Sequence, residues 1–360
     1  MEVKIRTLTH LWTGGIDGEV DRIHETGILG SLRWWMEVLV RGMGGNACDP
    51  TEQKCSSKNG LCEVCKVFGA EGQKRRFRLE VLQDNTQSDK IVSSKHDYKD
   101  KEGKTKTRIS RWLREKKPIS GTFTVQVQSL HLNFNPEIVV GLIQFIADWS
   151  ALGARPQMGF GVIQVEGGSR IDTQTLYDWL KQVEDKHEYP DLPSLHNIFL
   201  SKIQPKDSNK ASTEEDFTEE DTFNLKYDLR QLFRPQAESD NLKSLRHFIM
   251  GTVEDDRQAA KIKISRPYNE NGTTVMRVWG WIPESAKVCL KNNPEKDLYT
   301  NDWNREKVMD TIHQHLNKNY TLQVWREMNS PRDTVTPNEN DVQSFLCSLL
   351  NPQENSHANS

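Results

Sequence analysis

Residues 150–163 read Ser-Ala-Leu-Gly-Ala-Arg-Pro-Gln-Met-Gly-Phe-Gly-Val-Ile and join an apolar, helix-like run to a short strand-like segment. Glycine lacks a Cβ atom and tolerates positive φ angles, so Gly153, Gly159 and Gly161 allow a close approach to the backbone. Arg155 has a charge suited to a phosphate, and Phe160 has a face on which a base can stack. The alternative interpretation is a helix C-cap followed by a turn.

A second pattern lies near the N-terminus. A strand-like segment at 5–13 ends in Gly14 and Gly15, and Arg22 precedes a helix with the run Ile-Leu-Gly-Ser-Leu-Arg-Trp-Trp at 28–35. Hydrophobic residues recur in this helix at spacings of three and four, which is typical of an amphipathic helix. The strand, the Gly-Gly turn and the helix form one motif.

These patterns resemble the RAMP superfamily, the RNA-binding subunits of CRISPR effector complexes. The loop at 153–161 is similar to the glycine-rich loop of that family. The N-terminal motif and the segment Phe68-Gly69-Ala70 are similar to those of subunits of the type III-B (Cmr) complex, and the motifs cover about residues 3–166. The resemblance implies a ribonucleoprotein of antiviral defence, with guide RNA, target RNA and other RAMP subunits as partners. It also implies a place near the 3′ end of the guide.

The element pattern predicts an α+β fold of two ferredoxin-like (RRM-like) domains, each with the order β-α-β-β-α-β. In the first half, we expect these elements at 3–11, 26–41, 76–82, 121–134, 136–152 and 160–165. In the second half, after a helix at 173–183, we expect them at 197–203, 241–251, 260–266, 274–282, 300–316 and 321–327. Asn271-Gly272 indicates a hairpin turn.

The expected domains are residues 1–166, residues 167–330, and a C-terminal helix with a disordered tail at 331–360. The first contains a cysteine loop at 45–67 and a basic insertion at 84–118. The second contains an acidic, polar insertion at 205–222, which we interpret as flexible.

The cysteine loop predicts a metal site. Cys48, Cys55, Cys62 and Cys65 fall within 18 residues of a loop too polar to build its own core. Zinc prefers four N or S ligands in a tetrahedron, and the spacing of Cys62 and Cys65 lets one turn donate two thiolates. A closed set of four ligands leaves no position for a catalytic water, so we expect structural Zn²⁺. The alternative is a redox Cys-X-X-Cys pair.

Basic residues gather in two segments although the chain has a formal net charge of −3. One is the expected strand around 74–78; the other is 90–117, with eleven basic and four acidic residues. Phosphate contacts dominate nucleic-acid affinity, so a local basic excess indicates RNA contact more than the net charge does. The alternative is a solvated charged face, and for Arg33 an ion pair with Glu37 at i+4.

Taken with the resemblance, these patterns predict an RNA path. The residues that we expect to contact RNA are Gly14, Gly15, Arg22, Arg33, Trp34, Lys74, Arg75, Arg76, Arg78, Lys104, Lys106, Arg108, Arg111, Gly153, Arg155, Gly159, Phe160 and Gly161. We expect backbone amides and basic side chains on phosphates, and aromatic rings on bases.

The composition limits the class of protein. A chain of 360 residues is long enough for two domains. It shows no basic-then-apolar leader and no run approaching about 18 apolar residues, so we expect a cytoplasmic protein without membrane contact. In that compartment the six cysteines are not expected to form disulfides.

The leading hypothesis is a non-catalytic RNA-binding subunit. One alternative is metal-dependent cleavage of target RNA by a loop aspartate, for which Asp17 and Asp21 are the candidates. Acidic residues in a glycine-rich loop are also common turn formers. His10 and His24 flank this loop, but no partner for catalysis is recognisable in the sequence. A further alternative is a scaffold subunit that contacts protein only.

Overall fold

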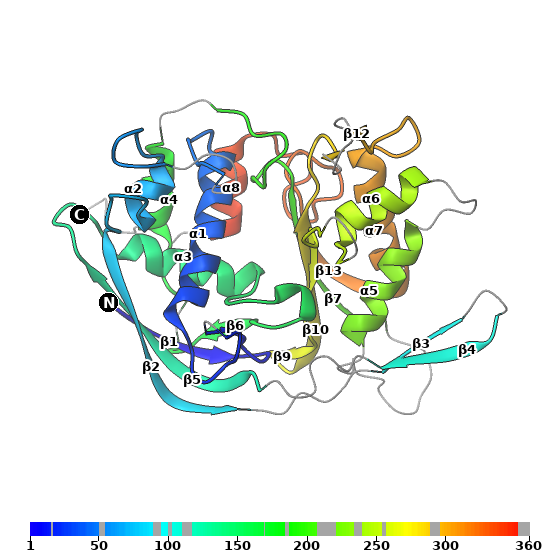
Figure 1. The fold of residues 1–360 in the computed structure, drawn as a ribbon, viewed down its shortest axis with the longest axis horizontal. Coiled ribbons are helices and arrows are strands. Elements are labelled where there is room, and N and C mark those ends of the chain that lie inside the picture. The colour runs from blue at the N-terminus through cyan, green and yellow to red at the C-terminus, as the bar shows by residue number, and fades with distance from the viewer. Residues whose placement is uncertain are drawn as a thin grey trace, which may run out of the picture.

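Two antiparallel sheets organise the chain (Figure 1). The computed structural model describes residues 1–15, 17–49, 55–88, 95–99, 103–109, 117–168, 170–183, 187–206, 221–233, 240–253, 257–288 and 296–351. No helix in these ranges has the length and apolar character needed to span a bilayer.

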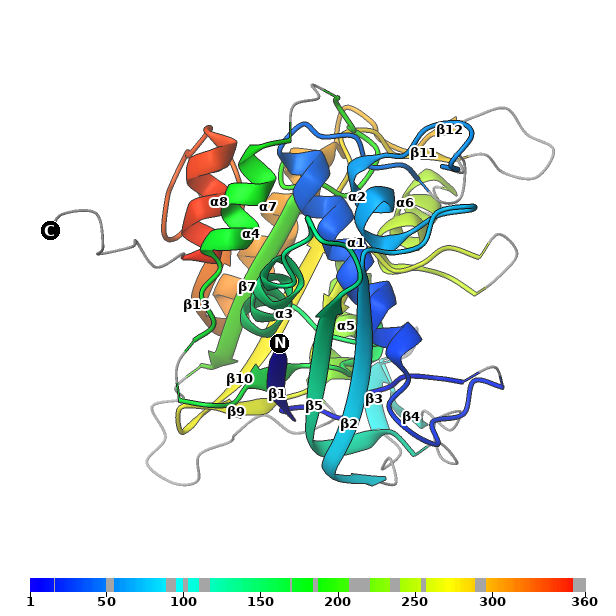
Figure 2. The ribbon, with the colours of Figure 1, turned by 90° about the vertical axis from the view of Figure 1, so that its left-hand side faces the viewer.

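The first sheet has the strand order β2-β5-β1-β6, with all neighbours antiparallel. Its strands are β1 (Glu2–Thr7), β2 (Phe77–Ser88), β5 (Ile119–Ser129) and β6 (Ile163–Val165). Helices α1 (Glu25–Gly42) and α3 (Glu137–Trp149) cover one face. In chain order the strands are arranged 2-3-1-4, which is consistent with the predicted ferredoxin-like unit. β2 and β5 run side by side over most of their length (Figure 2).

The second sheet repeats this arrangement with the order β13-β7-β10-β8. Its strands are β7 (Ile198–Pro205), β8 (Ile262–Ile264), β10 (Thr273–Trp281) and β13 (Tyr320–Arg326). Its helices are α5 (Asp221–Leu232), α6 (Asp240–Met250) and α7 (Arg305–Asn319). β9 (Tyr268–Glu270) and β10 form the predicted hairpin, whose turn residues Asn271 and Gly272 both have positive φ angles (54° and 85°).

Helices α1 and α3 are enclosed between the two sheets (Figure 1). Successive side chains of a strand point to opposite faces, so one strand can serve two cores. In β7, Ile198 and Leu200 join the core around α1 and α3, whereas Phe199 and Ile203 join the core around α5, α6 and α7. The order of layers is therefore sheet, helices, sheet, helices.

A buried guanidinium joins the second sheet to α3. Arg277 of β10 is 1% exposed, and its nitrogens donate to the carbonyl oxygens of Ala147 (2.7 Å) and Ser150 (2.8 Å) at the C-terminal end of α3. The same side chain donates to the Tyr268 hydroxyl at 2.8 Å. Helix C-termini leave carbonyls without intrahelical partners and attract cations, so this contact holds the two layers in one relative position.

Several elements differ from the prediction in extent. β1 ends at Thr7 rather than at residue 11, and β5 ends at Ser129 rather than at 134. The cysteine loop contains an unpredicted short helix, α2 (Glu63–Phe68), and the basic insertion contains an unpredicted hairpin. Its strands are β3 (Lys95–Lys99) and β4 (Thr105–Ile109), and β3 lies beside α5 (Figure 1).

Two helices from later in the chain complete the first core. α4 (Gln174–Lys181) packs on α3, and α8 (Val342–Leu350) packs on α4 (Figure 2). Phe345 and Leu349 of α8 belong to the same apolar core as α1. Most of the acidic insertion, 207–220, and the tail, 352–360, lie outside the described residues.

The remaining elements are short. They are a 3₁₀ turn (Pro156–Met158) in the glycine-rich loop and the two-residue strands β11 (Lys287–Val288) and β12 (Lys296–Asp297).

Candidate functional site

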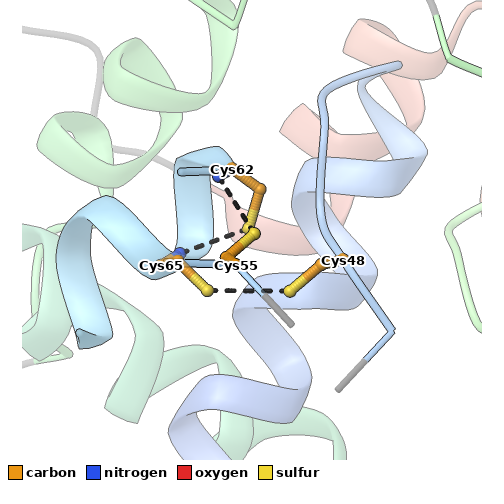
Figure 3. Close-up of side chains that lie close together, drawn as sticks. All are labelled: Cys48, Cys55, Cys62 and Cys65. Atoms are coloured by element: carbon orange, nitrogen blue, oxygen red, sulfur yellow. Dashed lines mark hydrogen bonds between the residues drawn. The ribbon is translucent and has the colours of Figure 1, made fainter. Parts of the chain in front are cut away.

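Four cysteines gather where the sequence predicts a metal site. The Sγ atoms of Cys48, Cys55, Cys62 and Cys65 all lie within 4.8 Å of one another (Figure 3). Tetrahedral zinc with Zn–S bonds of about 2.3 Å places its sulfurs about 3.8 Å apart. The Sγ atoms of Cys48 and Cys65 are 3.6 Å apart. The four side chains therefore could hold a metal ion, and they form the only such group of three or more His, Cys, Asp or Glu within the described ranges.

The short helix α2 builds half of this cluster. Cys62 is its N-cap residue and accepts a hydrogen bond from the backbone N–H of Cys65, with an N–S distance of 3.4 Å. Burial opposes ionisation of Cys62, but backbone hydrogen bonds from Cys48 and Cys65 hold its pKa below the usual value. Burial raises the pKa of Cys65 to about 11 and also raises the pKa of Cys48. A bound cation would keep all four sulfurs ionised together.

Arg33 contacts the cysteine cluster, and its role as an RNA contact stays a prediction. Its Nη2 donates to Cys65 Sγ (3.1 Å), its Nη1 to the Gly69 carbonyl (3.1 Å), and its Nε to Glu37 Oε1 (3.0 Å). The alternative pairing with Glu37 is thus confirmed. These bonds use three of the five guanidinium N–H donors, and the side chain of Arg33 remains 28% exposed.

The N-terminal glycine loop is organised by its own side chains. Asp17 accepts a hydrogen bond from the backbone N–H of Glu19 (2.9 Å), which is the turn-forming alternative. Asp21 pairs with His24, with 2.6 Å between Oδ1 and Nε2. Hydrogen bonding to His24 lowers the pKa of Asp21. His24 therefore has a partner that the sequence did not reveal.

Three further predicted residues lie at the same loop. Arg22 forms an ion pair with Glu25 at 3.0 Å. A Cβ added to Gly15 would lie 3.3 Å from the His24 ring, and one added to Gly14 would lie 3.3 Å from Gly18. The loop is therefore closely packed.

The three glycines of the second loop approach the chain's own backbone. A Cβ added to Gly153 would lie 2.6 Å from the Trp12 carbonyl oxygen, and one added to Gly161 would lie 2.0 Å from the Leu152 carbonyl oxygen. One added to Gly159 would lie 2.6 Å from the backbone nitrogen of Arg266. All three have φ angles between 85° and 91°. Each glycine is thus required by a turn, as in the alternative interpretation.

Phe160 and Arg155 both contact Trp12 within the protein. Phe160 is 0% exposed and packs against Trp12 and Met158, so its prediction as a base-stacking residue has to be corrected. Arg155 has a φ of 60° and places its guanidinium 4.1 Å from the centre of the Trp12 ring. It remains half-buried at the loop, where a role in phosphate binding stays a prediction.

The predicted basic residues lie largely at the surface. Lys74 and Arg78 are exposed, Arg75 and Arg76 are half-buried, and Arg78 pairs with Glu80. In the β3–β4 hairpin, Lys104 and Lys106 are exposed. The side chain of Arg108 and the whole of Arg111 lie outside the described residues.

A groove between α1 and the second sheet brings the two sequence motifs together. It has a volume of about 770 Å³ and lies between the first half of α1, the loop at 153–157 and the segment at 258–263. Its walls are mainly small and aromatic: Gly27, Gly30, Ser31, Trp34, Trp35, Gly153, Ala154, Phe248, Ala259, Ala260, Trp279 and Trp281. None of its described lining residues is acidic. Of the predicted RNA-contacting residues, Trp34 and Gly153 lie here.

Two lysines missed by the sequence analysis supply the charge of the groove. Lys261 Nζ lies 3.5 Å from the Phe248 ring centre, and Lys263 Nζ lies 5.4 Å from that of Trp34. The sequence signal for these lysines is the alternation Lys-Ile-Lys-Ile at 261–264. Ile262 and Ile264 lie in the second core, so both lysines point to the opposite face. An alternating strand whose second face is basic and covered by another layer indicates a site for an anion.

Comparison with known proteins finds a family match in the N-terminal part of the chain. Residues 4–164 match the model of the RAMP superfamily. This part of the chain is thus similar to the RAMP superfamily, and it contains β1, α1, α3 and the cysteine cluster. No curated protein matches the sequence.

Among solved structures, the chain is similar to two Cmr proteins. One is in the cryo-EM structure of the type III-B Cmr-beta bound to cognate target RNA and AMPPnP, with 11% identity, a TM-score of 0.44, and coverage of 87% of this chain and 98% of that chain. The other is the crystal structure of Cmr1 from Pyrococcus furiosus in its apo form, with 14% identity, a TM-score of 0.43, and coverage of 88% and 96%.

Proposed function

We propose that this chain is a non-catalytic, RNA-binding RAMP subunit of a type III-B CRISPR effector complex, equivalent to its first subunit. The observation that carries RNA binding is the groove, where Lys261 and Lys263 lie among tryptophans and no described lining residue is acidic. Phosphates require cations, and unpaired bases stack on aromatic rings. The RAMP domain supports the same class of function.

The proposal includes the partners that the motifs imply. They are guide RNA near its 3′ end, target RNA and other RAMP subunits, within a cytoplasmic ribonucleoprotein. The exposed basic residues of the 74–78 segment and of the β3–β4 hairpin would add affinity without sequence preference. The cysteine cluster would hold one structural Zn²⁺, for which its four sulfur donors are suited.

Charge reversal in the groove is expected to weaken RNA binding. The Lys261→Glu/Lys263→Glu variant should bind single-stranded RNA about 10- to 100-fold less tightly, because a charge-assisted hydrogen bond contributes about 1.5–3 kcal/mol. The slope of log affinity against log salt should also become shallower. Fluorescence anisotropy at several salt concentrations measures both quantities.

A matched control is Lys307→Glu/Lys318→Glu, which makes the same charge change on exposed positions of α7. It should leave RNA affinity within about twofold, since exposed charges at a distance are screened by salt. Equal loss in both variants would show that net charge, rather than the groove, controls binding.

RNA affinity is also expected to depend on pH. Burial, together with the nearby charge of Lys263, lowers the pKa of Lys261 to about 7, and burial lowers the pKa of Lys263 to about 8. Both ammonium groups are charged at pH values below about 6 and largely neutral above about 9. Affinity should therefore fall as pH rises through this range at constant ionic strength.

The Lys261→Arg/Lys263→Arg variant provides the control for this titration, because arginine remains charged throughout. Its RNA affinity should be nearly independent of pH. A wild-type affinity that does not change between these pH values would contradict a role for the two lysines.

An RNA cleavage assay tests the non-catalytic part of the proposal. We expect guide-paired RNA to remain intact with the chain and Mg²⁺. Cleavage that is lost in Asp17→Ala or Asp21→Ala would overturn this part, and absence of salt-dependent RNA binding would leave a protein-only scaffold.

A further inference from the structure

The two lysines of the groove lie at β8, Lys261 directly before the strand and Lys263 within it. Lys261 and Lys263 are two positions apart, and in extended chain this places their Cα atoms about 6–7 Å from each other. Successive phosphates of an extended single strand of RNA have a similar separation. Two neighbouring phosphates can therefore meet two neighbouring ammonium groups.

Each lysine also lies near a different tryptophan ring. Lys261 Nζ lies 5.0 Å from the Trp281 ring centre, and Lys263 Nζ lies 5.4 Å from the Trp34 ring centre. Both rings line the groove and are half-buried, so each has a partly exposed surface. The groove thus repeats one unit, a cation beside an indole, at two adjacent positions.

The ammonium groups keep hydrogen-bonding capacity for a ligand. Lys261 Nζ donates to the Phe248 carbonyl at 3.1 Å, and Lys263 Nζ donates to the Lys261 carbonyl at 3.1 Å. An ammonium has three N–H donors, and no described carboxylate pairs with either lysine. Gln258, which also lines the groove, has a buried Oε1 with no hydrogen-bond partner among the described residues.

We propose that the groove binds two successive unpaired nucleotides of RNA, an inference that rests on the proposed RNA-binding function. The phosphate of one nucleotide contacts Lys261 and its base stacks on Trp281; the next phosphate contacts Lys263 and its base stacks on Trp34. Gln258 Oε1 accepts a hydrogen bond from an amino or imino group of a base. An A-form duplex is excluded, because its bases are already stacked and paired inside the helix.

Competition against a labelled single-stranded RNA tests the number of nucleotides bound. The competitors are a 5′-mononucleotide, a 5′-phosphorylated dinucleotide, a 5′-phosphorylated trinucleotide and a hairpin without overhangs. We expect the dinucleotide to compete at least about tenfold better than the mononucleotide, because it fills a second cation–indole unit. The third nucleotide should add less than about threefold, and the hairpin should not compete.

Substitutions of the two tryptophans test whether the bases stack at these positions. Trp34→Leu and Trp281→Leu should each weaken dinucleotide binding about 5- to 150-fold, the range for loss of one base stack. Trp303→Leu, which lies in the second core away from the groove, is the matched control and should leave dinucleotide binding unchanged. Melting temperatures establish that all three variants are folded.

The outcomes separate this inference from the proposed function. If long single-stranded RNA binds but the dinucleotide competes no better than the mononucleotide, the inference is wrong and the function stands. The same holds if the hairpin competes equally or if both folded tryptophan variants keep wild-type affinity. If no RNA binds to the wild-type chain, the proposed function fails and this inference fails with it.

Discussion

Replacing Cys62 and Cys65 together by serine is expected to abolish metal binding and to destabilise the N-terminal half. The wild-type chain should contain close to one zinc ion, because its four Sγ atoms lie within 4.8 Å of one another. In small zinc-binding peptides, the apparent free energy of zinc binding is about 10–16 kcal/mol, and it stabilises the folded state. Val64 and Val67 of α2 are buried in the first core, so this part of the packing remains when the metal is lost. Metal analysis and thermal unfolding with and without chelator measure the two effects.

Cys347→Ser is the control for this experiment, since Cys347 is a half-buried free cysteine on α8 and not part of the cluster. It should retain zinc and nearly the wild-type melting temperature. Zinc-free wild-type protein with four ordinarily reactive thiols would contradict the metal site. A Cys62–Cys65 disulfide in zinc-free wild-type protein would support the redox alternative instead.

Arg277→Met is expected to produce the second large effect, a loss of about 3–5 kcal/mol of stability. Leaving a buried acceptor without its donor costs about 1–3 kcal/mol per group, and Arg277 serves two buried carbonyls. The substitution keeps much of the volume but leaves the carbonyls of Ala147 and Ser150 without their donors between the two sheets. Denaturant unfolding measures the change, and we expect the layers to separate before the individual cores unfold.

Arg6→Met is the matched control, because Arg6 has an exposed side chain on β1 that contacts Gln164 and Glu166. Exposed ion pairs contribute about 0–1 kcal/mol, so this variant should unfold almost as the wild type does. Equal unfolding midpoints for the two variants would show that Arg277 does not hold the layers together.

Much of the fold could be predicted from local patterns. Alternation along β1 and β5, the spacing of apolar residues in α1, and Asn271-Gly272 each concern residues a few positions apart. Such patterns depend on the geometry of a single strand, helix or turn, which the sequence encodes directly. The hairpin in the basic insertion was missed because its segments, Lys-His-Asp-Tyr-Lys at 95–99 and Thr-Lys-Thr-Arg-Ile at 105–109, contain too few apolar residues to show an apolar alternation.

The sequence by itself determined the two β-α-β-β-α-β units, the resemblance to the RAMP superfamily and the four sulfurs that could hold a metal. These are properties of spacing within short segments. The tertiary structure alone decided that Arg33 contacts Cys65, that Phe160 is buried against Trp12, and that Lys261 lies beside Trp281 in the groove. Partners such as these come from different elements, so they depend on how whole layers pack, and no local spacing rule specifies that packing.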